Sequence, residues 1–218
     1  MKKPFLLATS AVLASAPALA DDIVLSATVD GGVPTIITSV DGNLNVNSQS
    51  FGADFDLNTL SINAGPGFLA APGILNTNTL DVNQVVTGSH TLVLDILARN
   101  LVGTGALTSL LDEFSVTGLT TGWSVVEQTL VDGVIEATTP TIFANSASAD
   151  VTTSALLSNP FSAEAIYTIS SNGVGQFNGG IDISAAPVPG PLAGSGLPGI
   201  VAACLSLLGL SRIRRRRA

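Results

Sequence analysis

Between residues 21 and 186, apolar and polar residues alternate over short runs, which is the pattern of half-buried β-strands. In Leu92–Ala98 and Ala163–Ile169 one face of the run is apolar throughout. Around residues 55–62 the apolar positions change faces between Leu57 and Leu60, which predicts a β-bulge. The pattern predicts strands at 23–29, 35–40, 54–62, 80–86, 91–98, 113–117, 123–130, 134–138, 163–170 and 175–183.

Turn-forming dipeptides separate these runs. Val131–Val134, with Asp132-Gly133 at its centre, is the best hairpin candidate because glycine readily adopts positive φ. Residues 103–111 are expected to form one short helical turn, and Trp123 is expected to pack in the core. Many short strands without long helices predict an antiparallel β-sandwich, with the immunoglobulin-like arrangement as one candidate.

The first twenty residues have the three-part organisation of a secretory signal peptide. Lys2 and Lys3 give a positive start, and the apolar stretch that follows is too short to span a membrane. Ala18 and Ala20 supply the small-x-small pattern that signal peptidase requires, with Asp21 directly after the expected cut. Residues 1–20 are therefore expected to be removed during export through the general secretory machinery.

Residues 187–218 differ in character from the strands. An extended motif of Val188, Pro189, Gly190 and Pro191 opens the segment, since proline fixes φ. Residues 192–210 carry no charge, and their number is near the lower limit for a transmembrane helix. A cationic cluster closes the chain: Arg212, Arg214, Arg215, Arg216 and Arg217. The positive-inside rule keeps that cluster in the cytoplasm and places the body outside.

The charge of the body is strongly negative. All sixteen acidic residues lie between Asp21 and Asp182, where Arg99 is the only lysine or arginine, so this interval has a formal charge of −15. The whole-chain value of −8 conceals this. Such a body is not expected to bind nucleic acid, which requires basic residues against its phosphates. Cys204 is the only cysteine, so no intrachain disulfide can form, and stability must come from the core or from bound ions.

The order of features at the C-terminus resembles the PEP-CTERM sorting signal: a Val-Pro-x-Pro motif, a glycine-containing apolar helix and an arginine cluster. Gly190 stands where the most familiar form has glutamate, and Gly196–Gly199 opens the apolar helix, as in the Val-Pro-Gly-Pro variant. The resemblance implies recognition by an exosortase and cleavage near the proline motif. It also implies release or attachment at the cell surface, often alongside exopolysaccharide.

Candidate catalytic residues are few. His90 is the only histidine, so a Ser-His-Asp arrangement would have to use it, and its place before a strand predicts an exposed turn residue. No nucleophile-elbow, metalloprotease or phosphate-binding motif is present. An enzyme is therefore not expected. The enzymatic alternative requires His90 or paired acids to converge in a pocket.

The carboxylates suggest one metal hypothesis. Asp54 and Asp56 lie two residues apart on one strand face and could contribute oxygen ligands to a Ca²⁺ site. The adjacent acids Asp112-Glu113 are a further pair, and none of these matches a known calcium loop. No other cofactor is expected.

Three segments are therefore predicted: a signal peptide at 1–20, an acidic β-sandwich body at 21–186 and a sorting signal at 187–218. The leading interpretation is an exported, non-enzymatic surface or matrix protein that passes through an inner-membrane-anchored intermediate. The alternative is an adhesion module for polysaccharide or protein that stays anchored by its tail.

Overall fold

A computed structural model describes residues 22–65, 74–103 and 105–186. These ranges contain strands and turns, and no helix within them is long and apolar enough to cross a membrane. The twelve strands are β1 (Asp22–Val29), β2 (Thr35–Ser39), β3 (Asn43–Phe51), β4 (Phe55–Ala64), β5 (Leu75–Gln84), β6 (His90–Leu101), β7 (Ala106–Leu119), β8 (Ser124–Val131), β9 (Val134–Thr138), β10 (Ala147–Leu157), β11 (Phe161–Ser171) and β12 (Gly175–Ala186).

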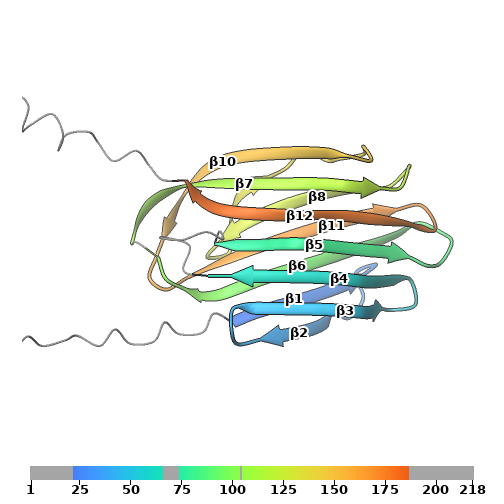
Figure 1. The fold of residues 1–218 in the computed structure, drawn as a ribbon, viewed down its shortest axis with the longest axis horizontal. Coiled ribbons are helices and arrows are strands. Elements are labelled where there is room, and N and C mark those ends of the chain that lie inside the picture. Colours follow the sequence, from blue (N-terminus) through green and yellow to red (C-terminus); the bar gives the residue numbers. More distant parts are fainter. Residues whose placement is uncertain (1–21, 66–73, 104, 187–218) are drawn as a thin grey trace, which may run out of the picture.

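The strands form two six-stranded antiparallel sheets that face each other. Sheet A has the order β2-β1-β6-β11-β8-β9, and sheet B has the order β10-β7-β12-β5-β4-β3. Figure 1 shows sheet B in front of sheet A, with the strands of both sheets running along the long axis of the body. The architecture is an antiparallel β-sandwich, as the alternating pattern predicts.

The core lies between the two sheets because each strand turns its apolar face inward. The alternation in β11 is complete, with buried and partly exposed residues following one another along the whole strand. Aromatic side chains fill the centre: the rings of Phe55 and Trp123 meet edge to face at 6.5 Å, and those of Phe114 and Tyr167 at 5.9 Å. Burying each large apolar side chain contributes roughly 1.5–3 kcal/mol, so this layer provides the main stabilisation.

Several local predictions are confirmed. The register of β4 against β5 shifts between Leu57 and Thr59, where the change of face predicts a bulge. Asp132 and Gly133 both have positive φ in the turn that joins β8 to β9, and Val131 pairs with Val134. Trp123 is fully buried, and its indole N–H donates to the carbonyl oxygen of Gly173 at 3.2 Å.

Other local predictions are wrong. The expected helical turn is absent from the described residues of 103–111, because β7 begins at Ala106 and pairs with β10 from Ala106 to Val116. The sequence pattern also misses β3 and β10 and starts β5 too late. With six strands in each sheet, the sandwich is larger than the immunoglobulin arrangement of about seven to nine strands.

The expected signal peptide, the proline motif at 188–191, the apolar segment and the arginine cluster lie outside the described residues. The expectations about export and sorting therefore stay predictions.

Candidate functional site

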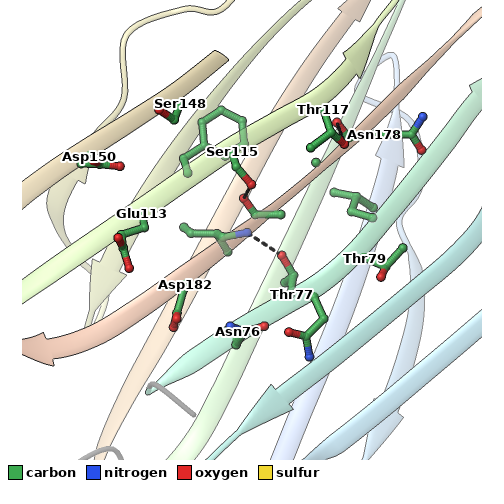
Figure 2. A pocket seen from close by; sticks show the side chains of 16 residues that line it. Asn76, Thr77, Thr79, Glu113, Ser115, Thr117, Ser148, Asp150, Asn178 and Asp182 are labelled. Carbon is green, nitrogen blue, oxygen red and sulfur yellow. Dashed lines mark hydrogen bonds between the residues drawn. The ribbon is translucent and has the colours of Figure 1, made fainter. Parts of the chain in front are cut away.

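An open groove of about 760 Å³ lies on the outer face of sheet B in the described part of the chain. It runs across β10, β7, β12 and β5, and polar side chains from all four strands line it (Figure 2). The polar lining residues are Asn76, Thr77, Asn78, Thr79, Glu113, Ser115, Thr117, Ser148, Asp150, Asn178 and Asp182. No lysine or arginine is among the residues that line it.

Sheet register places three acidic residues in one row across this groove. Asp150 on β10 pairs with Glu113 on β7, which pairs on its other side with Asp182 on β12. Asn76 on β5 continues the row beside Asp182. Side chains directly opposite in an antiparallel pair have Cβ atoms about 4.5–5.5 Å apart, and like charges in such positions destabilise the sheet. The row therefore has an unfavourable electrostatic energy when no ligand covers it.

The floor of the groove is made by glycine. Gly179 and Gly180 lie at an irregularity of β12, where its register against both β5 and β7 shifts. A Cβ atom at Gly179 would lie 2.6 Å from the Ser115 carbonyl oxygen, and one at Gly180 would collide with the Thr77 carbonyl oxygen. At both positions neighbouring atoms occupy the place of a side chain, so only glycine fits this part of the groove.

Two oxygen atoms in the groove wall have no hydrogen-bond donor among the described residues. They are Oδ1 of Asn76 and Oδ1 of Asp182, both buried and on neighbouring strands (Figure 2). Beneath them the Thr77 hydroxyl oxygen accepts the Ile181 N–H at 2.9 Å and lies 2.7 Å from the Tyr167 hydroxyl. A buried oxygen without a donor costs about 1–3 kcal/mol. These two oxygens are therefore left without a donor inside the described part of the fold.

A second cluster lies at one end of the sandwich, where three turns meet. Asp30 follows β1, Asp54 lies in the turn between β3 and β4, and His90 opens β6. One ligand atom from each residue lies within 4.8 Å of the other two, and in the described chain this is the one such group of three or more His, Cys, Asp or Glu residues. His90 Nδ1 lies 2.7 Å from Asp30 Oδ2. Sequence reasoning singles out His90 and Asp54 separately but does not identify Asp30.

The environment of His90 differs from that of an exposed turn residue, because its side chain is only 22% exposed. The hydrogen bond with Asp30 raises the pKa of His90, and the same bond, with a second from the Thr91 N–H, lowers the pKa of Asp30. Within the described chain the ring is bonded to a carboxylate, not to a serine hydroxyl. His90 thus converges with two acidic residues. A Ser-His-Asp mechanism also needs a serine hydroxyl as nucleophile, and none is bonded to the His90 ring among the described residues.

Asp56 does not join this cluster. Its Oδ1 accepts the Ser50 hydroxyl at 2.6 Å on the outer face of sheet B. Asp54 is grouped instead with Asp30 and His90, residues from sheet A.

A third polar group is buried between the sheets. Asp112 on β7 and Glu127 on β8 are 1% and 0% exposed, and the Thr129 hydroxyl oxygen lies 3.0 Å from a carboxyl oxygen of each. Burial, followed by the charge of Asp112, raises the pKa of Glu127 to about 9, and burial also raises the pKa of Asp112. At neutral pH the pair therefore retains a proton.

A fourth acidic pair lies on the outer face of sheet A. Asp95 on β6 and Glu164 on β11 are neighbouring carboxyl groups, with Arg99 nearby. Partial burial, followed by the charge of Asp95, raises the pKa of Glu164 to about 7, and burial raises the pKa of Asp95.

Comparisons with known proteins do not identify a family for this chain. No protein family profile matches the chain, and no curated protein matches it in sequence. A solved structure of TmCBM61 in complex with β-1,4-galactotriose is similar over 58% of this chain and 82% of its own, at 10% identity and a TM-score of 0.37. At that score the likeness carries no inference about the ligand of this chain.

Proposed function

We propose that this chain is an exported, non-enzymatic surface or matrix protein that binds polysaccharide in the groove on sheet B. The observation that carries the proposal is the row of three carboxylates, Asp150, Glu113 and Asp182, across an open groove whose other polar side chains are hydroxyls and amides. Carboxylates only accept hydrogen bonds, and no lysine or arginine lines the groove to pair with them.

The polar groups that line the groove indicate which class of ligand it would bind. Sugar hydroxyl groups can donate to the carboxylates and also accept from the hydroxyl and amide groups beside them, and an open groove across four strands accommodates a segment of a long chain. The row formed by Asp150, Glu113 and Asp182 disfavours polyanions. Neutral polysaccharides and those with protonated amines are therefore the preferred ligands.

The polysaccharide proposal predicts that single changes in the acidic row weaken binding. Asp182→Asn and Glu113→Gln each remove an ionised acceptor while keeping the size of the side chain. A hydrogen bond to a charged group contributes about 1.5–3 kcal/mol, so each variant should bind at least about tenfold more weakly. Affinity electrophoresis of the full chain through gels containing exopolysaccharide from the producing cells measures this loss.

Glu136→Gln is the matched control, because Glu136 lies on β9 of sheet A and does not line the groove. Equal retardation of the wild type and all three variants would contradict binding in the groove. Retardation of none would contradict polysaccharide binding.

We also propose sorting through the C-terminal segment, on the evidence of the Val188–Pro191 motif, the uncharged stretch after it and the terminal arginines. In this proposal signal peptidase cuts after Ala20 and an exosortase cuts near the proline motif. The acidic body then reaches the cell surface or the medium. The alternative is a chain that remains anchored by its tail.

Intact mass of the protein from its native cells distinguishes these alternatives. Cleavage at both ends predicts a mass that corresponds to a chain starting at Asp21 and ending within residues 187–191, found outside the inner membrane. A mass that still includes Arg214–Arg217, found only in the inner membrane, would contradict exosortase processing and support the anchored form.

A further inference from the structure

The cluster formed by Asp30, Asp54 and His90 stands apart from the polysaccharide groove and combines the ligand types of a transition-metal site. It offers one imidazole nitrogen and two carboxylate groups, with one ligand atom of each lying within 4.8 Å of the others. A cavity of about 430 Å³ adjoins it, and both Asp30 and Asp54 line that cavity. Space for bound water is therefore present beside the carboxylates.

The backbone around each of the three residues is fixed by hydrogen bonds to a neighbouring strand. The Asp30 N–H donates to the Thr91 carbonyl oxygen at 2.9 Å, and the Thr91 N–H returns a bond to Asp30 Oδ1 at 2.8 Å. The Val85 N–H donates to the carbonyl oxygen of Asp54 at 2.9 Å. The three side chains therefore start from fixed positions, which is what a preorganised site requires.

The hydrogen bonds of the fold leave the Asp54 carboxylate without a donor among the described residues. Asp30 is occupied by His90 and Thr91, whereas no donor contacts the Asp54 side chain in the described part of the chain. A second carboxylate thus faces a histidine that already has an acidic partner. A bound cation would balance this charge.

We propose that Asp30, Asp54 and His90 bind one divalent transition-metal ion, with Zn²⁺ as the best match. Imidazole suits zinc and its neighbours, whereas calcium takes oxygen ligands. Three protein ligands with water completing the shell is a common zinc arrangement. Two ligands on one zinc ion lie roughly 3.3 Å apart, so the 2.7 Å contact between His90 and Asp30 opens slightly on binding.

The position of this site indicates what the metal would do. His90 opens β6 of sheet A, Asp30 directly follows β1 of the same sheet, and Asp54 belongs to the β3–β4 turn of sheet B. One ion would therefore link sheet A to sheet B at the end of the sandwich where these turns meet. The only cysteine lies outside the described residues and cannot form an intrachain disulfide, so a metal ion supplies the cross-link between sheets that the chain otherwise lacks.

The test is Zn²⁺ binding by the untagged full chain, measured by calorimetry and by thermal unfolding with and without a chelator. The expected result is one Zn²⁺ per chain and a rise in melting temperature that the chelator reverses. His90→Ala and Asp54→Asn should each weaken binding at least tenfold. Asp56→Asn is the matched control and should bind as the wild type does, because Asp56 is bonded to Ser50.

Either of two results would overturn the proposal. One is an absence of Zn²⁺ binding by the wild type, or equal binding by the His90→Ala and Asp54→Asn variants. The other is stabilisation by millimolar Ca²⁺ that Asp56→Asn abolishes and His90→Ala leaves intact. That second result would assign the ion to Asp54 and Asp56 as a calcium pair.

Discussion

At the scale of single residues, the face of a strand decides what an acidic side chain does. Asp112 and Glu113 are adjacent in sequence, but successive side chains of β7 point to opposite faces. Asp112 is 1% exposed and shares a buried site with Glu127, whereas Glu113 lies in the groove row. Paired acids in a sequence therefore do not mark one site when they lie on a strand.

The buried pair predicts an unusual dependence of stability on pH. The pKa of Glu127 is raised in the folded chain to about 9 from an ordinary value of 4.5, so its stabilising contribution is complete below that ordinary value. That contribution is lost as the pH rises towards 9. Between these limits the free energy of unfolding should fall by at most about 1.4 kcal/mol per pH unit.

Glu127→Gln should remove most of this slope, because the amide is neutral at every pH in that window. Its stability relative to the wild type should increase from pH 5 to pH 9. Urea unfolding at a series of pH values, followed by the fluorescence of Trp123, measures the difference. Glu136→Gln serves as the exposed-face control, and a wild-type slope that survives in Glu127→Gln would show that Glu127 is not its source.

At the scale of the elements, β12 combines a central place in sheet B with two glycines that shape the groove. Gly180→Ala would place a Cβ atom against the Thr77 carbonyl oxygen. Such overpacking costs about 1–3 kcal/mol, and equilibrium urea unfolding should show a loss of that size. Gly65→Ala is the matched control, since a Cβ atom there meets nothing within 4 Å. Equal stability of both variants would contradict the close packing beneath the groove.

The strands that sequence reasoning misses share a physical cause. β3 and β10 are rich in Asn, Ser, Thr and Ala, which have weaker or more ambiguous strand signals than the valine, isoleucine and aromatic residues elsewhere. Both are also edge strands of sheet B, where one side of the backbone has no partner strand. Their positions depend on pairing with β4 and β7, and pairing across the sheet is not visible in a local pattern.

At the scale of the whole molecule, strand order creates the candidate sites. Asp54 and His90 could be identified as chemically interesting from their residue types alone. Their approach to Asp30 could not, because it depends on three turns from two sheets meeting at one end. The groove likewise joins residues from Asn76 to Asp182, which only the register of four strands brings together.

The described body begins and ends on the side opposite the Asp30, Asp54 and His90 cluster. Asp22, at the start of β1, pairs with Arg99 at the opposite end of β1 from Asp30. Ala186, at the end of β12, lies at the opposite end of sheet B from the β5–β6 connection (Figure 1). In a chain held by its C-terminal segment, the cluster therefore points away from the attachment and the groove faces sideways.

The place of β12 also determines how the body responds to a mechanical load. A pull on Ala186 acts along a strand that is hydrogen-bonded to β7 on one side and to β5 on the other. The load is therefore a shear shared by both ladders, so many bonds must yield together instead of one after another. Forced unfolding depends on the unfolding rate, and we expect the shared load to slow it. The strand that leads to the C-terminal segment is thus placed to bear tension without unravelling the sandwich.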